Sequence, residues 1–202
     1  DLGAEPLLVM NEQHRDDYSY EVVYEPYSND TAVATLRAAQ AAPVDSYLLV
    51  FPADHYIYQV EPFLSDIRAG LKEAERDSIL LFGLSPTSPE NKYGYIIPTE
   101  EGVLFREKPS TSIAQYYITQ GALWNSGIFG ASRELLLQLL APLQDWIDHP
   151  RPGKAPSFDV AVLQEYSKIK VYPGQGWSWS DVGTWDSFLL LPEVITEMRN
   201  NP

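Results

Sequence analysis

The stretch YLLVFPADH at 47–55 joins a continuous apolar run to a short polar turn. A run of this kind is typical of a strand that is buried on both faces, as in a parallel sheet. Ligands of α/β sheets bind at the carboxyl ends of strands, and residues 52–55 follow this run directly. The stretch therefore predicts a buried strand over 47–51 and a candidate functional turn after it. From topology alone, an ordinary connecting turn is as well supported as a functional one.

Strand and helix patterns alternate along the rest of the chain. Strands are expected at 7–10, 21–24 and 79–82, and helices at 31–42, 61–76 and 132–140. This alternation indicates an α/β fold with a mainly parallel sheet. A length of 202 residues is sufficient for a single domain with a substantial core.

Composition and charge narrow the classes of partner. The 45% hydrophobic and 21% charged residues describe an ordinary globular protein, and the net charge of −14 argues against nucleic-acid and anionic-membrane partners. Cysteine is absent, no signal-peptide pattern is visible, and no apolar run approaches the roughly 20 residues of a membrane span. We expect a cytoplasmic protein.

A second stretch, WSWSDVGTWD at 177–186, repeats the arrangement of an aspartate in a polar turn beside apolar sequence. Asp54 and Asp181 are thus a separated pair of carboxylates, the usual protein contribution to a magnesium ion that also binds phosphate oxygens. An isolated aspartate after a strand is more often a turn or cap residue. The pair gains weight from the motifs that lie between its members.

Three polar clusters occupy the middle of the chain. Gly94 stands between two tyrosines, where a glycine lets a ligand approach the backbone, although a strand bulge is a comparable explanation. Glu107 and Lys108 end a strand before a proline; they suit sugar hydroxyls and a phosphate, while a solvated strand end is the commoner origin of such a pair. Asn125 is embedded in apolar sequence, so its amide needs a backbone or ligand partner.

These motifs, in this order, resemble the bacterial mannose-1-phosphate guanylyltransferases, and the resemblance covers nearly all of the chain. Single motifs of this kind are weak signals, whereas the ordered set is a strong one. The motifs are EPYSNDTA at 25–32, FPADH at 51–55, GLSPTSPENKYGYI at 83–96, FREKP at 105–109, LWNSGIF at 123–129, SFDVAV at 157–162 and WSDVGTWD at 179–186.

The resemblance implies a Rossmann-like nucleotidyltransferase fold, with a mainly parallel mixed sheet and helices on both faces. The enzyme would join mannose 1-phosphate to GTP and release pyrophosphate, and a homodimer is compatible with the resemblance. Mg²⁺ would be bound by Asp54 and Asp181, and Lys108 would bind the sugar phosphate. The remaining sugar-binding positions that it implies are Gly94, Glu107, Asn125 and Gly127. Catalysis would consist of positioning and charge neutralisation, without a covalent intermediate.

Glu25 is the candidate for guanine recognition. Guanine presents two neighbouring donors, N1–H and the 2-amino group, and a carboxylate accepts both in a bidentate pair. Related enzymes that use thymidine nucleotides carry glutamine at this place. A glutamate that merely closes a surface strand is the competing interpretation.

Departures from the family pattern also matter. The family begins with a glycine-rich phosphate-binding loop that has no counterpart here, so we expect a domain that is incomplete at its N-terminus. The connection over residues 11–20 is short for a crossover between parallel strands, which predicts segments missing near 15–20 and near 150–155. Alternatives are a non-catalytic regulatory domain of the same fold, or a carbohydrate-binding module that uses surface tryptophans.

Overall fold

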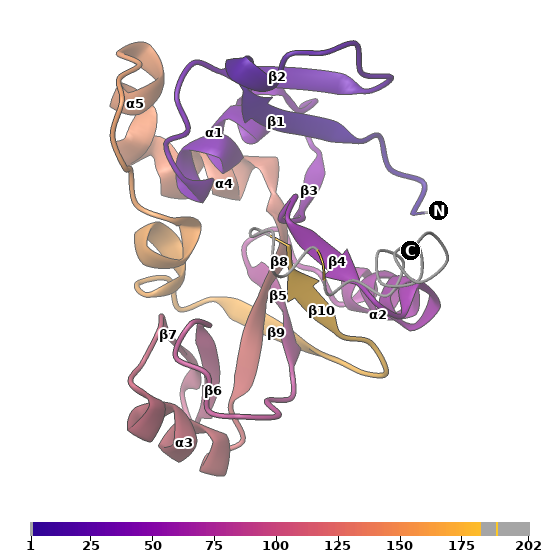
Figure 1. Ribbon diagram of the computed structural model, residues 1–202, viewed down its shortest axis with the longest axis vertical. Coiled ribbons are helices and arrows are strands. Elements are labelled where there is room, and N and C mark those ends of the chain that lie inside the picture. The colour runs from indigo at the N-terminus through magenta and orange to yellow at the C-terminus, as the bar shows by residue number, and fades with distance from the viewer. Residues whose placement is uncertain (1, 183–188, 190–202) are drawn as a thin grey trace.

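The computed structural model describes residues 2–182 and 189 (Figure 1). Its strands are β1 (Leu7–Asn11), β2 (Glu21–Glu25), β3 (Tyr47–Val50), β4 (His55–Ile57), β5 (Ile79–Leu84), β6 (Tyr95–Thr99), β7 (Gly102–Arg106), β8 (Leu123–Ser132), β9 (Ile169–Gly174) and β10 (Trp179–Asp181). Its α-helices are α1 (Thr31–Ala41), α2 (Val60–Lys72), α3 (Thr111–Thr119), α4 (Arg133–Leu140) and α5 (Gln144–Asp148). Single helical turns cover Glu12–His14, Ala141–Leu143 and the π-helical segment Asp159–Leu163.

The α/β class and the expected strands and helices are confirmed, but the expectation of a mainly parallel sheet was wrong. The main sheet has the order β7-β6-β8-β5-β9, with β3 added to β8. β8 runs antiparallel to β3, β5 and β6, and among the described residues only β5 and β9 pair in parallel within this sheet. β1 and β2 form a separate parallel pair, and β4 and β10 a separate antiparallel pair.

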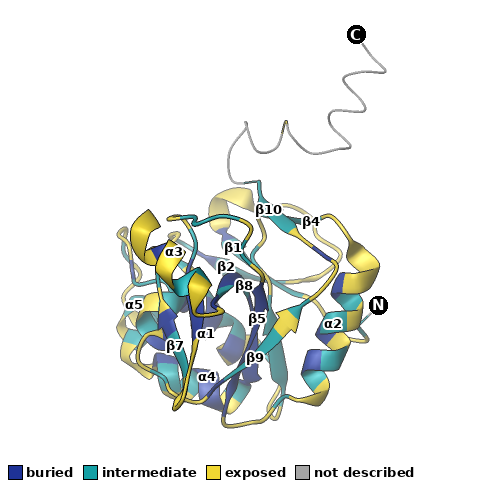
Figure 2. Ribbon diagram, turned by 90° about the horizontal axis from the view of Figure 1, so that it is seen from below, coloured by how far each residue is buried: buried dark blue, intermediate teal, exposed yellow. Residues whose placement is uncertain are grey.

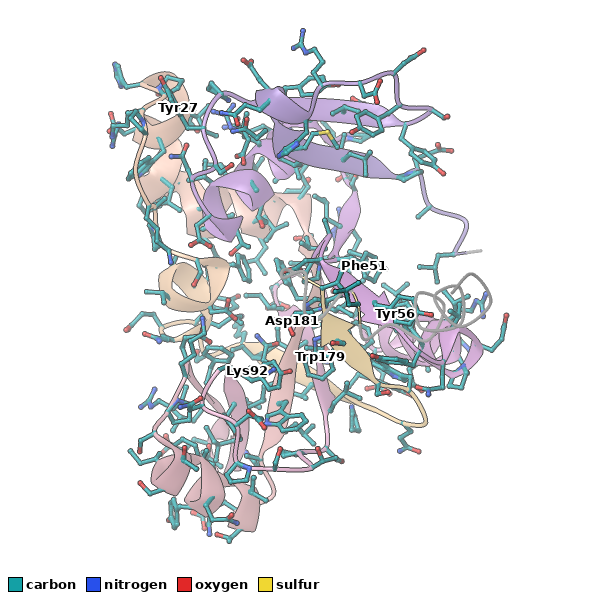
Figure 3. All side chains as sticks on the ribbon, viewed as in Figure 1. Tyr27, Phe51, Tyr56, Lys92, Trp179 and Asp181 are labelled. Carbon is teal, nitrogen blue, oxygen red and sulfur yellow. The ribbon has the colours of Figure 1, made fainter. Side chains whose placement is uncertain are left out.

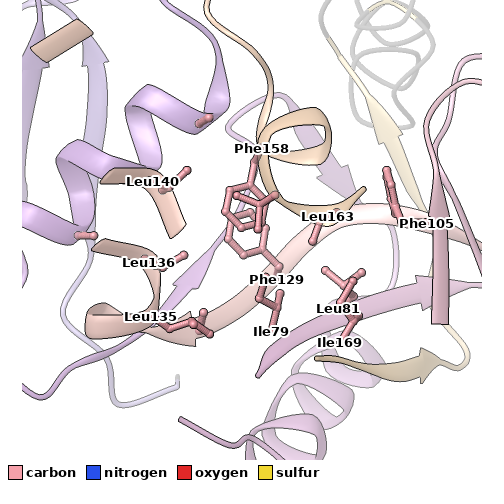
Figure 4. Close-up of a cluster of buried hydrophobic side chains, with 14 of the residues drawn as sticks. Ile79, Leu81, Phe105, Phe129, Leu135, Leu136, Leu140, Phe158, Leu163 and Ile169 are labelled. Carbon is pink, nitrogen blue, oxygen red and sulfur yellow. The ribbon is translucent and has the colours of Figure 1, made fainter. Parts of the chain in front are cut away.

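Burial on both faces explains why strand direction was misjudged. All six residues of β5 are buried. Ile79 and Leu81 point into the core formed with α1 and α4 (Figure 4). Leu80 and Phe82 pack into a second core with α2. A continuous apolar run therefore reports that both faces are covered, and this holds for antiparallel strands as well.

The ribbon coloured by burial also shows that helices cover the central strands (Figure 2). The central strands are dark, and α2 and α4 present their exposed residues outward. The cap expected at Ser132 is confirmed, because its hydroxyl accepts a hydrogen bond from the amide of Leu135. Asp30 caps α1 through its side chain and the amide of Thr31. No helix within the described residues is long and apolar enough to cross a membrane.

β1 and β2 are parallel neighbours, yet only residues 12–20 connect them. This connection contains a single 3₁₀ turn, Glu12–His14, where a crossover between parallel strands ordinarily includes a full helix. Between β1 and β3 lies a cavity of 460 Å³ lined by residues 7–10 and 50–53 and by small residues of α1. Asn125 and Asp159 also line this cavity. The cavity therefore borders the candidate site on the side of β1, the N-terminal strand.

Candidate active site

Asp54 and Asp181 lie side by side, although 127 positions separate them in the sequence. The antiparallel pair of β4 and β10 places Asp181 opposite His55, and the amide of Val182 donates to the carbonyl of Asp54 at 2.6 Å. Their side chains remain 56% and 50% exposed, so both carboxylates are available to a ligand. The structure thus brings the two aspartates together.

Aromatic packing fixes the strand that carries Asp181. Trp179 lies 5.2 Å from the ring of Tyr93 and 6.2 Å from that of Trp124. Lys92, the neighbour of Tyr93, places its Nζ 4.0 Å from a carboxylate oxygen of Asp181 (Figure 3). The ammonium group therefore offsets part of the negative charge on one side of the aspartate pair.

His55 is a site residue that the sequence reasoning missed. Its Nε2 lies 3.9 Å from Asp54, and its Nδ1 is buried without a hydrogen-bond partner among the described residues. Burial lowers the pKa of His55, and the charges of Asp54 and Asp181 oppose that change. The only available signal was its position directly after Asp54 in the sequence.

A second group lies around the ends of β6, β7 and β8 and consists of Gly94, Glu107, Lys108 and Asn125. Together with Asp159 it is here called the sugar-side cluster, after the role that the family resemblance implies for these four residues. The backbone amide of Asn125 donates a hydrogen bond to the backbone carbonyl of Gly94 at 2.8 Å. A side chain on Gly94 would begin 2.8 Å from a carboxylate oxygen of Glu107, so this glycine provides the space that Glu107 occupies. A strand bulge does not explain it, since Gly94 directly precedes β6.

Lys108 is held next to Glu107 by an ion pair of 3.0 Å. Hydrogen bonding to Glu107 raises the pKa of Lys108, which keeps the ammonium charged at neutral pH. Its backbone adopts φ of 43°, a left-handed conformation that is unfavourable for a lysine and that recurs at functional sites. The side chain of Lys108 is 62% exposed, and the residue lines a cavity of 560 Å³.

Asp159 joins this cluster and was not assigned a role from the sequence. Its Oδ1 accepts a hydrogen bond from Nδ2 of Asn125 at 2.7 Å. Burial raises the pKa of Asp159 to about 6, and the nearby charge of Glu107 acts in the same direction. Its signal in the sequence is the aspartate of SFDVAV, one of the motifs that carry the family resemblance.

Gly127 connects the sugar-side cluster to the aspartate pair. Its amide donates to Oδ1 of Asn125 at 3.2 Å, and its φ is 73°, a conformation that favours glycine. On its other side, a Cβ would lie 3.1 Å from Pro52 and 3.5 Å from His55. The two groups of residues therefore border one continuous region around β8.

Negative charge dominates this region, as judged from the described residues. Its carboxylates are Asp30, Asp54, Glu107, Asp159 and Asp181, and its ammonium groups are Lys92, Lys108 and Lys154. A phosphate-containing ligand therefore needs additional positive charge. Two carboxylates with free oxygens fit a divalent cation that shares its coordination with phosphate. Among residues 2–182 and 189, no three acidic, histidine or cysteine side chains are grouped tightly enough to hold a metal by themselves.

Glu25 lies apart from these groups, at the end of β2. Its side chain is 7% exposed, and one carboxylate oxygen is buried without a hydrogen-bond partner in the described part of the chain. Burial raises the pKa of Glu25, and the charge of Arg37 opposes the change. The Nε and Nη2 atoms of Arg37 are buried and equally without partners among the described residues. Unsatisfied groups of this kind are satisfied by water or by a ligand.

Trp124, Trp177 and Trp179 do not provide exposed stacking platforms for carbohydrate. Trp124 and Trp177 are 8% and 5% exposed, and both belong to apolar clusters. Trp179 packs on Tyr93 and His55. Trp185 lies outside the described residues. These contacts identify Trp124, Trp177 and Trp179 as packing residues.

The chain belongs to the nucleotidyl transferase family, whose model matches residues 4–197. The family is one whose enzymes generally use a divalent metal. The chain is 30% identical over 231 residues to the mannose-1-phosphate guanylyltransferase of Salmonella montevideo, covering 92% of this chain and 49% of that protein. It is 32% identical over 227 residues to the alginate biosynthesis protein AlgA of Pseudomonas aeruginosa, covering 90% of this chain and 47% of that protein.

Among solved structures, a mannose-1-phosphate geranyltransferase from Thermus thermophilus matches with a TM-score of 0.73 and 28% identity, over 94% of this chain and 64% of that chain. The nucleotidyltransferase fold is thereby confirmed. The chain spans about half the length of the curated relatives it matches. Those matches extend over more residues than the 202 of this chain, so the relatives carry segments that have no counterpart within it.

Proposed function

We propose that this chain is the nucleotidyltransferase domain of an enzyme that transfers GMP from GTP to mannose 1-phosphate, giving GDP-mannose and pyrophosphate. One observation supports this above the others. In a chain of the nucleotidyl transferase family, the aspartate pair and the sugar-side cluster meet through Gly127 at one region. A metal–phosphate site beside a hydroxyl-binding site is the arrangement that a sugar phosphate and a nucleotide require together.

The sugar side would bind mannose 1-phosphate by charge and hydrogen bonds. Lys108 lines the 560 Å³ cavity, and its ammonium could pair with a phosphate there as a point charge. Glu107 accepts hydrogen bonds from hydroxyl groups, and Asn125 both donates and accepts. Because the sugar phosphate oxygen is already a competent nucleophile, these residues would act by orientation alone.

Asp54 and Asp181 would hold Mg²⁺, with phosphate oxygens completing its coordination. The cation would supply the positive charge that this acidic region lacks, and so offset the repulsion between the two anionic substrates. Lys92 lies beside Asp181 and would add to that charge. We further propose that the protein acts in the cytoplasm.

Calorimetry of the chain with mannose 1-phosphate is the first test. Saturable binding that weakens strongly in Lys108→Ala is the expected result. Lys168→Ala is the matched control, because its exposed ion pair with Asp77 is far from the site in sequence and contributes little. Absence of mannose 1-phosphate binding, or equal loss in both variants, contradicts the proposal.

Pyrophosphate release from GTP then separates an enzyme from a regulatory domain of the same fold. The regulatory domain is favoured by the features around Glu25, the candidate for guanine recognition, here called the nucleotide side. Glu25 is buried there, and Asp30 adds negative charge next to α1. Turnover that depends on both mannose 1-phosphate and Mg²⁺ supports the enzyme. Sugar-phosphate binding without any pyrophosphate release from the complete gene product supports the regulatory domain.

A further inference from the structure

Asp159 stands where the two cavities of the candidate site meet. It lines both the 560 Å³ cavity beside Lys108 and the 460 Å³ cavity between β1 and β3. It begins the π-helical turn Asp159–Leu163, an element that packs over β8. The position gives its carboxylate access to any ligand that spans the two cavities.

Apolar packing and a backbone contact already hold this turn in place without Asp159. The ring of Phe158 stacks on Phe129 of β8, with centroids 4.0 Å apart and planes 8° from parallel (Figure 4). The amide of Phe158 also donates to the hydroxyl of Thr31 at 2.9 Å. The carboxylate at the next position is therefore not needed to attach the turn to the sheet.

The surroundings of Asp159 are unfavourable for a negative charge. Burial and the neighbouring Glu107 both raise its pKa, whereas a backbone hydrogen bond and the charge of Lys108 lower it less. A carboxylate in such a place lowers stability unless it is neutralised or paired. Residues of this kind concentrate at functional sites, where a local cost is accepted for a specific geometry.

The hydrogen-bond pattern shows what that geometry is. Asn125 accepts from the amide of Gly127 through Oδ1 and donates to Asp159 through Nδ2. An ionised carboxylate only accepts hydrogen bonds, so it selects the nitrogen side of the carboxamide and disfavours its flipped orientation. One amide hydrogen and one carbonyl lone pair of Asn125 remain for other partners.

We propose that Asp159 is a positioning residue of the sugar-phosphate site, which fixes the carboxamide of Asn125 so that its remaining donor and acceptor bind hydroxyl groups of the sugar. This inference rests on the proposed function, since it specifies how the same site recognises its sugar. Asp159 acts through Asn125 and takes no part in the phosphoryl chemistry.

Two substitutions separate positioning from charge. Asp159→Asn keeps an oxygen that can accept from Asn125, whereas Asp159→Ala removes the acceptor and leaves the carboxamide free to rotate. Calorimetry should show affinity for mannose 1-phosphate falling about three- to tenfold in Asp159→Ala, the effect of one hydrogen bond, and less than about threefold in Asp159→Asn. Affinity for GTP should change in neither variant.

A spectroscopic readout tests the same step without any substrate. The side-chain amide of Asn125 should give a resolved pair of NMR signals with slowed exchange in the unmodified chain and in Asp159→Asn. In Asp159→Ala the pair should move towards the shifts of a solvated amide. Phe158→Leu is the control, because it loosens the attachment of the turn while retaining the carboxylate.

The outcomes are distinguishable. Unchanged Asn125 signals in Asp159→Ala, or unchanged affinity for mannose 1-phosphate, overturn the positioning role. Equal loss of affinity in the alanine and asparagine variants also overturns it, because the carboxylate would then act through its charge. Failure of the unmodified chain to bind mannose 1-phosphate at all refutes the proposed function, and the amide signals still decide whether Asp159 orients Asn125.

Discussion

The proposed sugar side of the candidate site, which is the sugar-side cluster with Gly127, and its proposed nucleotide side around Glu25 are built differently. On the sugar side, Gly94, Asn125, Gly127 and Asp159 are linked by hydrogen bonds of 2.7 to 3.2 Å. On the nucleotide side, Glu25 and Arg37 interact through their charges, yet each has buried polar atoms that no hydrogen bond between described residues satisfies. On the sugar side, none of these four residues has a buried side-chain atom that lacks a hydrogen-bond partner in the described part of the chain. The nucleotide side contains buried polar groups that need a partner.

The difference follows from which strands carry each side. The sugar side stands on β6, β7 and β8, which belong to the main sheet and position one another through continuous pairing. The nucleotide side stands on β2, whose only strand partner among the described residues is β1. We therefore expect substitutions on the sugar side to change a preformed site, and substitutions near Glu25 to depend more on what binds there.

The largest effect should come from the aspartate pair, which both sides share. Asp54→Asn and Asp181→Asn preserve size but remove the charge that a cation needs, and each should lower Mg²⁺-dependent turnover of the complete enzyme by more than about a hundredfold, since loss of mere supporting contacts at metal sites costs roughly 10- to 100-fold. Asp77→Asn, at an exposed ion pair, is the control. Near-normal turnover in either site variant would remove the metal role.

Lys108→Ala should have the next largest effect, restricted to the sugar side. Loss of a charge-assisted contact to phosphate corresponds to about 1.5–3 kcal/mol, or roughly a ten- to hundredfold weaker affinity for mannose 1-phosphate. The affinity for GTP should be nearly unchanged. Separate titrations with the two substrates make the measurement, and equal losses would place Lys108 between the two sites or make it structural.

Much of this organisation could be predicted from the sequence, for physical reasons that differ between elements. Alternating strand and helix patterns report local periodicity, so β1, β3, β5 and α1 were located within about one or two residues. Strand direction could not be predicted in the same way. The run over Ile79–Leu84 has the same composition whether its neighbour β8 is parallel or antiparallel, because only burial is encoded there.

The candidate site was predictable only where a residue type implied its own chemistry. Glu107, Lys108 and Asn125 stood out as polar residues beside apolar strands, and the structure groups them. His55 and Asp159 were missed, since their importance comes from contacts with Asp54 and Asn125 that are distant in sequence or visible only in three dimensions. Their local sequence contains nothing beyond a histidine after an aspartate and a single acid in a helical turn.

Glu25→Gln tests the nucleotide side. The amide replaces one acceptor by a donor that would face a guanine donor, which costs on the order of 1–3 kcal/mol, or about a five- to hundredfold drop in affinity for GTP. Thymine presents an acceptor next to its N3–H and should escape this penalty. The ratio of kcat/KM for GTP and dTTP in the complete enzyme is the measurement. An unchanged ratio combined with a lower Tm would assign Glu25 to a structural contact with Arg37 instead.

The smallest expected effect concerns stability on the sugar side and follows from the raised pKa of Asp159. In the folded chain this pKa is about 6, compared with an ordinary value of 3.8. Between these values the folded state binds more protons than the unfolded state, so Asp159 lowers stability progressively as the pH rises from about 4 to about 6, and the penalty is complete above about pH 6.

Asp159→Asn removes this titration and keeps a hydrogen-bond acceptor for Asn125. The difference of about two between the folded and ordinary pKa values corresponds to at most roughly 3 kcal/mol, and partial exposure to solvent reduces that figure. We therefore expect the variant to be more stable by about 1–2 kcal/mol at about pH 7.5. Near pH 4 the two proteins should have similar free energies of unfolding, because Asp159 is then protonated in the folded state. Urea unfolding at both pH values gives the comparison, with Asp17→Asn in the exposed 12–20 connection as the control for the substitution itself. A stability difference that is the same at both pH values would show that ionisation of Asp159 does not destabilise the folded site. Asp159 would then not be a residue that is kept at a cost in stability for the geometry of the sugar side.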